Sequence, residues 1–275
     1  MANADIIKLH DGNLMPQLGL GVWQASNEQV VGAITKALEV GYRSIDTAAA
    51  YHNEEGVGRA LKQSALPRDA LFITTKLWND DQQHPADALQ RSLEKLGLDY
   101  VDLWLMHWPV PAKAHYVDAW KGMIALQQQG LVKSIGVCNF NIDHLQKIMD
   151  ETGVRPVINQ IELHPYLQQR QLQVWNATHQ IQTESWSPLA RAGEGIFEQK
   201  LIHRLAEKYR KTPAQIVIRW HLDNGLVVIP KSVTPARIEE NFNVWDFRLD
   251  KEELALFAGL DCGKRLGPDP ERFGA

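Results

Sequence analysis

The sequence has few cysteines, no long hydrophobic run and no excess of positive charge. Its two cysteines, Cys138 and Cys262, are too few for a disulfide framework and fit a reducing compartment. No apolar stretch approaches the roughly 18 residues of a transmembrane helix, and charged residues interrupt positions 1–13, so we expect no signal peptide. Lys and Arg number 29 against 33 Asp and Glu, a net charge of −4, which disfavours polyanions. We therefore expect a cytoplasmic protein with neither nucleic acid nor a membrane as partner.

What is present has the composition of an ordinary globular protein. Of the 275 residues, 44% are hydrophobic and 23% are charged, close to the average for folded domains. No low-complexity tract and no linker rich in Pro, Gly and Ser divides the chain. We therefore predict a single domain spanning residues 1–275, which is within the size range of one large barrel.

Short apolar runs alternate with stretches of helical periodicity along most of the chain. Some runs, such as Val227-Val228-Ile229, are apolar at successive positions, as in parallel strands buried on both faces. Eight strands are predicted, at residues 18–23, 43–47, 71–76, 101–106, 133–138, 157–161, 181–185 and 226–230. Eight strands alternating with helices predict a (β/α)8 TIM barrel of the α/β class.

Helix signals and turn residues add detail to this barrel. Capping boxes begin helices at Ser26 and Thr212, and two helices, about 200–209 and 213–223, fit between the seventh and eighth strands. Residues 6–9 and 14–17 flank Asp11-Gly12-Asn13, which predicts an N-terminal β-hairpin covering the bottom of the barrel. Residues 246–275 are expected to form an extra helix and an irregular tail.

A doubly wound dinucleotide-binding sheet is the competing architecture. Its glycine fingerprint is incomplete here, because Gly19-Leu20-Gly21 is followed by Val22-Trp23-Gln24 without a third glycine. The sequence therefore favours the barrel.

Four residues with catalytic potential fall at the carboxyl ends of neighbouring predicted strands, where TIM barrels place their chemistry. They are Asp46, Tyr51, Lys76 and His107. A nearby ammonium favours a phenolate, so Lys76 is expected to lower the pKa of Tyr51 and make it a better acid. Asp46 would keep Lys76 charged, and His107 could orient a carbonyl oxygen. Each residue alone also has a structural explanation, as an ion pair or a core histidine, but their convergence favours proton donation to a carbonyl.

These residues lie within motifs that resemble the aldo-keto reductase family over essentially the whole chain. The motifs are residues 41–48 (GYRSIDTA), Tyr51 with Asn53-Glu54, 73–78 (ITTKLW), 105–109 (LMHWP), 136–140 (GVCNF), 159–162 (NQIE) and 229–233 (IPKSV). More narrowly, the chain is similar to the short-loop bacterial 2,5-diketo-D-gluconate reductase type. The resemblance implies a (β/α)8 barrel and NADPH-dependent reduction of aldehydes and ketones. It also implies that Tyr51 is the acid, with Asp46, Lys76 and His107 completing the catalytic set.

The resemblance further implies a set of cofactor contacts. Asn139 and Gln160 would hold the nicotinamide carboxamide, and Trp186 would stack on the ring. The other cofactor residues implied are Ser187, Leu189, Lys231, Ser232, Thr234, Arg237, Glu240 and Asn241, the last six around the adenosine 2′-phosphate and adenine. Barrel phosphate sites often use the loops after strands seven and eight and a helix N-terminus, which Thr234-Pro235 would begin. Cys138 stands where many members have serine, and Trp186 where many have tyrosine.

Aromatic residues dominate the expected substrate site. Trp23, Trp78 and Trp108 follow predicted strand ends and would form the pocket wall with His107. An aromatic mouth suits small carbonyls broadly. By resemblance the substrates include 2,5-diketo-D-gluconate (reduced to 2-keto-L-gulonate), methylglyoxal and β-keto esters. A small-molecule carbonyl is the expected partner, no metal is expected, and a monomer is the default.

Three other functions compete with a reductase. A Schiff-base aldolase would need a neutral Lys76, which Asp46 opposes. A metal-dependent hydrolase could use His107 and His164, but no matching cluster of carboxylates accompanies them. A barrel that senses nucleotides without turnover would not need the Tyr51/Lys76 pair.

Overall fold

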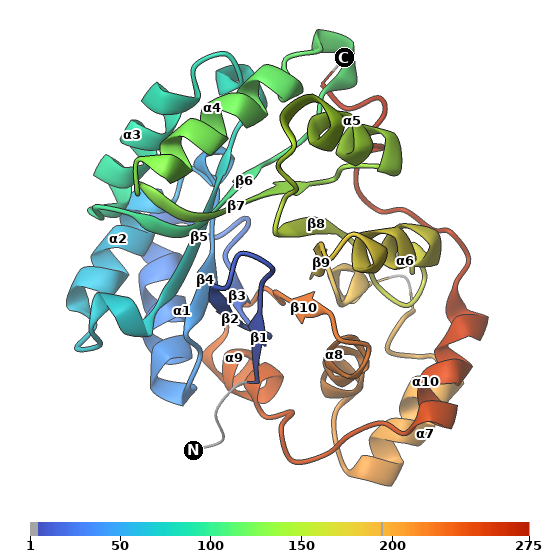
Figure 1. Ribbon diagram of the computed structural model, residues 1–275. Helices are drawn as coiled ribbons and strands as arrows, with labels where there is room; N and C mark the ends of the chain where they lie inside the picture. Colours follow the sequence, from blue (N-terminus) through green and yellow to red (C-terminus); the bar gives the residue numbers. More distant parts are fainter. Residues whose placement is uncertain (1–4, 194, 275) are drawn as a thin grey trace.

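The computed structural model describes residues 5–193 and 195–274, and its parallel strands form a barrel surrounded by helices (Figure 1). The strands of the main sheet are β3 (Leu20–Gly21), β4 (Ser44–Asp46), β5 (Phe72–Leu77), β6 (Val101–Met106), β7 (Val132–Cys138), β8 (Ile158–Glu162), β9 (Gln182–Trp186) and β10 (Val227–Val228). They lie in sequence order, and each pairs with the next in parallel. The predicted TIM barrel is confirmed, and the doubly wound alternative is excluded.

Backbone bonds close the sheet between its first and last strands. Gly19 N donates to Val228 O over 3.0 Å, and Gly21 N donates to Pro230 O over 3.2 Å. The strands at this seam are shorter than predicted. β10 ends at Val228, and Pro230, two residues later, has no amide hydrogen with which to extend the seam.

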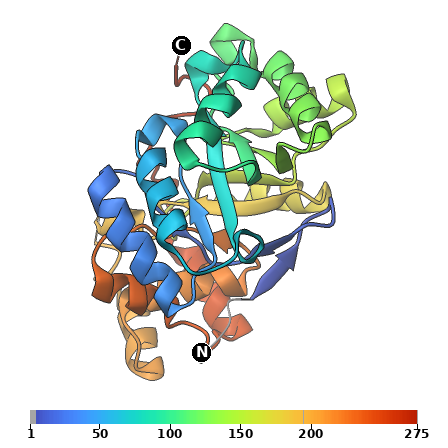
Figure 2. The same ribbon diagram turned by 90° about the vertical axis from the view of Figure 1, so that its left-hand side faces the viewer.

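The helices cover the outside of the barrel (Figures 1 and 2). They are α1 (Asn27–Val40), α2 (Glu54–Gln63), α3 (Pro85–Leu96), α4 (Tyr116–Gln128), α5 (Ile142–Thr152), α6 (Arg170–Thr178), α7 (Lys200–Tyr209), α8 (Pro213–Asp223), α9 (Pro235–Phe242) and α10 (Lys251–Leu256). The capping boxes at Ser26 and Thr212 are present, and α7 and α8 occupy the predicted ranges. Sequence analysis did not identify α2 or α6, because α2 contains two glycines and α6 is short and polar.

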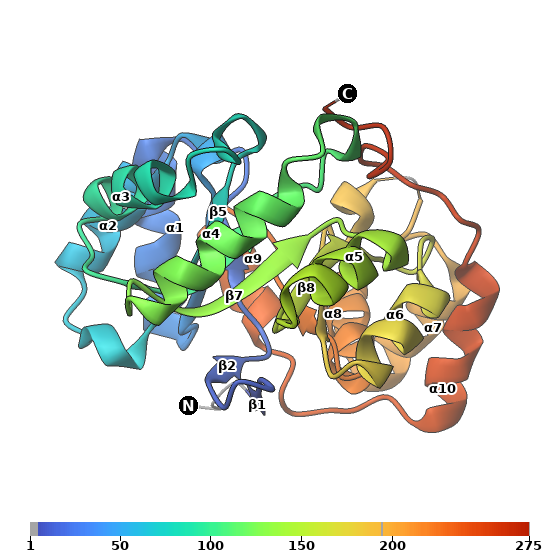
Figure 3. The same cartoon turned by 45° about the horizontal axis from the view of Figure 1, so that its top comes forward.

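The predicted hairpin covers one end of the barrel. Strands β1 (Ile6–Lys8) and β2 (Leu14–Pro16) pair antiparallel, and Met15 is completely buried among side chains from the strands, including Phe72, Leu103 and Val227. Figure 3 shows the hairpin at the bottom and the end of the C-terminal tail at the top. The hairpin therefore closes the bottom, and the carboxyl ends of the strands are left for chemistry.

Candidate functional site

The structure brings the four predicted catalytic residues together at the carboxyl ends of the strands. Asp46 ends β4, Lys76 lies in β5, and His107 directly follows β6. Tyr51 ends a short 3-10 helix (Ala49–Tyr51) after β4. Lys76 Nζ lies 3.4 Å from Tyr51 Oη, and the rings of Tyr51 and His107 meet edge to face with centroids 5.7 Å apart.

Lys76 is fully enclosed and surrounded by oxygen atoms. Its ammonium donates to a carboxylate oxygen of Asp46, to Thr47 O over 2.9 Å, and to Tyr51 Oη. Burial alone would lower the pKa of Lys76, but the charge of Asp46 and the proximity of Tyr51 outweigh it and raise the pKa. Lys76 is therefore charged, which opposes the Schiff-base alternative because that chemistry needs a neutral amine.

The pKa of Tyr51 differs from the expectation drawn from the sequence. Burial raises the pKa of Tyr51 to about 12, and the opposing effect of Lys76 is smaller. The predicted lowering was wrong because removal of the phenol from water penalises the phenolate more than one ammonium favours it. Much of the charge of that ammonium is also already neutralised by Asp46. Tyr51 thus stays protonated in the neutral pH range.

His107 is a neutral imidazole. Burial, followed by the charge of Lys76, lowers its pKa well below the ordinary value. Its Nδ1 atom is buried and has no partner among the described protein residues. His107 itself lines the cavity described below, so its ring can contact a ligand bound there.

Asp46, Tyr51 and His107 border a cavity of about 810 Å³, while Lys76 is buried and does not line it. The cavity wall contains the predicted aromatic residues Trp23, Trp78 and Trp108. Sequence analysis missed Pro268 and Phe273, which the C-terminal tail contributes, and Arg191, which lies 5.3 Å from the centre of the Trp23 ring. No local motif placed the tail, so its proximity to the cavity arises from the tertiary fold.

Most of the predicted cofactor residues line the same cavity, namely Asn139, Gln160, Trp186, Ser187, Leu189, Lys231 and Arg237. Trp186 Nε1 donates to Asn139 Oδ1 over 2.8 Å, and Asn139 Nδ2 donates to His107 O over 3.0 Å. Gln160 Nε2 donates to Asp46 and Glu184, while its Oε1 faces the Cys138 thiol at 3.9 Å. Asn139 and Gln160 are therefore held firmly at the cavity floor.

The four other predicted cofactor residues are not part of the cavity wall. Ser232 Oγ accepts from Thr234 N over 3.1 Å, and Thr234 precedes α9 without a capping bond from its own side chain. Glu240 accepts from Thr212 Oγ1 over 2.8 Å, while Asn241 is buried in α9. These positions are adjacent to the site through α9 and the loop before it.

Two cations give one end of the cavity an affinity for anions. Lys231 and Arg237 both line it and are exposed. Among residues 5–193 and 195–274, neither has an ion-pair partner. Arg237 lies in the first turn of α9, where the helix dipole also favours negative charge. This end of the cavity fits the phosphate of a dinucleotide such as NADPH.

The metal-dependent alternative would need clustered ligands in the part of the chain that the structure describes. No group of three or more potential metal ligands occurs there, and His164 is instead bonded to Glu162 at 3.0 Å.

No helix among the described residues combines the length and apolar character needed to cross a membrane.

Comparisons with known proteins agree with this geometry. A model of the Aldo/keto reductase family matches residues 16–261. "Methylglyoxal reductase DkgA" of Salmonella typhimurium is 76% identical, and DkgA of Escherichia coli strain K12 is 75% identical, each over 274 residues and 100% of both chains. The crystal structure of a mutant of Gox0644 in complex with NADPH has a TM-score of 0.94 and 46% identity, covering 98% of this chain and 99% of that one. The chain therefore belongs to the aldo-keto reductase family, and it is an NADPH-dependent oxidoreductase.

Proposed function

We propose that this oxidoreductase reduces small aldehydes and ketones, with Tyr51 as the proton donor to the carbonyl oxygen. The observation that carries the proposal is the contact of Lys76 Nζ with Tyr51 Oη, 3.4 Å apart, because Tyr51 lines the cavity. When bound, NADPH supplies the hydride for the carbonyl carbon. The residues of the chain bind and orient the substrate and deliver the proton.

The protein's part in the proton transfer follows from the charges around Tyr51. As the Tyr51 proton moves to the substrate oxygen, a phenolate develops beside the Lys76 ammonium, which is fixed by Asp46. A fixed charge stabilises such a developing charge without reorganisation. His107, which is neutral, would donate a hydrogen bond to the same carbonyl oxygen and hold it near Tyr51.

The cofactor would lie along the wall from Trp186 to α9. Asn139 and the Oε1 atom of Gln160 would bind the carboxamide, and Trp186, with Ser187 and Leu189, would cover the nicotinamide side. Lys231 and Arg237, with Ser232 and Thr234, would bind the 2′-phosphate. Glu240 and Asn241 would contribute to the adenine side only through the position of α9, since Glu240 is engaged by Thr212.

Methylglyoxal is the first substrate to test, because the relatives at 75–76% identity carry its reductase name. 2,5-Diketo-D-gluconate and β-keto esters such as ethyl acetoacetate are the other proposed substrates. The wall of Trp23, Trp78 and Trp108 supports a preference for compact carbonyls over one tightly specified substrate.

Tyr51→Phe tests the proton donor. It removes only the hydroxyl, and we expect kcat for methylglyoxal to fall by about 10²–10⁴-fold, the usual contribution of a positioned acid. NADPH oxidation measures turnover, and quenching of tryptophan fluorescence measures NADPH binding, which should change little.

Tyr209→Phe is the matched control. Tyr209 donates to Glu253 and is not among the residues that line the cavity, so loss of its hydroxyl should leave kcat unchanged. Tyr51→Phe with wild-type turnover would refute the proton-donor role. Failure of the wild type to reduce any of the three carbonyls while binding NADPH would refute the substrate class.

A further inference from the structure

The C-terminal tail reaches the cavity without forming a helix or strand. After α10 and a 3-10 helix (Phe257–Leu260), it returns to the top of the barrel (Figure 3). Phe273 packs on Trp108 with ring centroids 4.4 Å apart, and it lies edge-on to Trp78 at 6.3 Å. Since no regular hydrogen-bond ladder fixes this segment, its position depends on individual contacts with the barrel.

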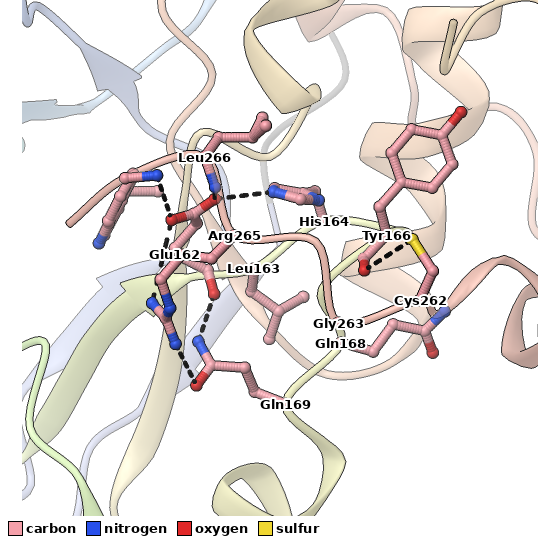
Figure 4. A network of polar contacts seen from close by, with 12 residues as sticks. Glu162, Leu163, His164, Tyr166, Gln168, Gln169, Cys262, Gly263, Arg265 and Leu266 are labelled. Carbon is pink, nitrogen blue, oxygen red and sulfur yellow. Dashed lines mark hydrogen bonds and ion pairs between the residues drawn. The ribbon is translucent and has the colours of Figure 1, made fainter. Parts of the chain in front are cut away.

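The strongest of these contacts is made by Glu162, the last residue of β8. Its side chain is fully buried, and its two carboxylate oxygens accept the backbone amides of Leu266 and Gly267 over 2.6 and 2.8 Å. His164 Nε2 is 3.0 Å from one oxygen and Arg265 Nη1 is 3.9 Å from the other (Figure 4). Hydrogen bonds to a buried carboxylate are among the stronger ones in proteins. The barrel thus binds the tail by its backbone.

Glu162 remains ionised in this position. Burial alone would raise its pKa, but the hydrogen bond from His164 and the amides of Leu266 and Gly267 outweigh that effect and lower the pKa. A charged acceptor is therefore present for both amides over the neutral pH range.

Gly267 adds a second, steric condition at the same point. A methyl group there would overlap the Trp186 ring and approach Glu162 Oε2 to 2.9 Å. Its backbone is outside the left-handed region, so lack of space alone demands glycine. The tail consequently lies directly against Trp186, a wall residue of the cavity.

A weaker contact lies further along the tail. Glu271 accepts from Asn141 Nδ2 and lies 3.5 Å from His144 Nε2. Its side chain is 53% exposed, and exposed ion pairs contribute little. Glu162 is therefore the principal point of attachment.

We propose that Glu162 is a positioning residue, which holds the tail segment 265–274 across the cavity so that Phe273 completes the substrate wall with Trp78 and Trp108. The inference rests on carbonyl reduction at this cavity, as proposed above. Glu162 acts through the tail and not on the reacting atoms. Its loss should therefore weaken substrate binding more than it slows the chemical step.

Glu162→Gln is the direct test. Glutamine keeps the volume but offers one oxygen and an NH2 group where two amides now need acceptors. Loss of a hydrogen bond to a charged group changes the equilibrium constant for attachment of the tail by about tenfold or more. We expect about that acceleration of hydrogen exchange in residues 262–274 and a similar rise in KM for methylglyoxal, with kcat within about twofold.

A double-mutant cycle with Phe273→Ala separates positioning from a general structural role. If Glu162 acts through Phe273, Glu162→Gln should change KM by less than about twofold in the Phe273→Ala background, because coupled residues are not additive. An equal rise in KM with and without Phe273 would overturn the proposal.

Gly267→Ala tests the same attachment of the tail if Glu162→Gln fails to fold. It displaces the same segment while leaving the carboxylate in place, and it should raise KM and tail exchange in the same direction. Gly259→Ala is its matched control, since a methyl group there meets no atom within 4 Å. Glu253→Gln is the control for a buried carboxylate, because Glu253 binds Lys208 and Tyr209 away from the cavity.

Hydrogen exchange distinguishes failure of this inference from failure of the proposed function. Unchanged tail exchange in Glu162→Gln and Gly267→Ala overturns the attachment, whatever the activity. Faster exchange in a protein that reduces no carbonyl would retain the attachment but overturn the role in substrate binding.

Discussion

Lys76 carries a charge although its side chain is completely buried, and this charge governs the energetics of its neighbours. Its Nζ atom is satisfied by Asp46, Thr47 O and Tyr51 Oη. A buried pair of this kind contributes little net stability, yet removal of one partner leaves an uncompensated charge.

We expect Lys76→Met to destabilise the protein by about 3–5 kcal/mol, because the buried Asp46 carboxyl group would lose its ion-pair partner. The double variant Asp46→Asn/Lys76→Met should lose clearly less than the sum of the two single variants. Urea unfolding of all four proteins measures this coupling. Additive losses would show that the two side chains do not stabilise each other. Activity should be lost in every variant.

Glu184 is a second buried carboxyl, on the strand next to that of Gln160. Burial, with a further effect of Asp46, raises its pKa to about 8. One of its oxygens has no partner among the described residues. In the unfolded chain it would ionise near 4.5, so between that pH and about 8 the folded state binds the extra proton. The stability that this proton brings is present at low pH and is lost as the pH rises through about 8.

Glu184→Gln should therefore flatten the pH dependence of stability. Relative to the variant, the free energy of unfolding of the wild type should fall by up to about 1.4 kcal/mol per pH unit as the pH rises from about 5 to 8. The measurement is the difference between the two free energies of unfolding at several pH values. Parallel curves would show that Glu184 is already ionised in the folded protein.

At the scale of elements, close backbone approach explains why α2 contains glycines that weaken its sequence signal. A methyl group at Gly58 would lie 2.6 Å from the carbonyl oxygen of Leu96 at the end of α3. A methyl group at Gly56 would likewise collide with Asn27 O. The Gly56 amide also donates to Asn27 Oδ1 over 2.6 Å. The glycines allow α1, α2 and α3 to pack closely.

Gly58→Ala should destabilise the protein by about 1–3 kcal/mol, since a backbone oxygen cannot move aside as a side chain can. Gly32→Ala is the matched control. Gly32 is also helical, but a methyl group there meets nothing within 4 Å. The higher helix propensity of alanine should therefore stabilise the Gly32→Ala protein by about 0.5–1 kcal/mol. Thermal unfolding compares the two. An unchanged or higher Tm for Gly58→Ala would contradict the packing argument.

At the scale of the whole molecule, the barrel separates stability from chemistry between its two ends. The hairpin buries Met15 at the bottom, while the tail brings Phe273 to the top. A change at the bottom should therefore alter folding without altering the site.

Met15→Ala should cost about 2–5 kcal/mol through the cavity that it leaves, with kcat and KM unchanged. Leu14→Ala is the control on the same strand, because Leu14 is 60% exposed and such surface changes stay within about 0.5 kcal/mol. Urea unfolding and steady-state kinetics test both. A change in KM for Met15→Ala would show that the ends are coupled.

Much of this architecture was predictable because its signals are local. Periodicity and capping residues identified all eight strands of the barrel, the hairpin, and helices such as α7 and α8. The position of strand ends then placed Asp46, Tyr51, Lys76 and His107 on one face. These predictions succeeded because hydrophobic period and turn chemistry act within a few residues.

Local sequence patterns are enough to identify the barrel, its family and the residues at the strand ends. The behaviour of those residues depends on the assembled structure around them. The pKa of Tyr51 depends on burial by distant segments, and the neutral state of Glu184 depends on burial and on Asp46 from a non-neighbouring strand of the sheet. The place of Phe273 depends on Glu162, which binds the backbone of a tail 104 residues later in the chain. Desolvation and long-range backbone contacts are properties of the assembled fold, and no local pattern records them.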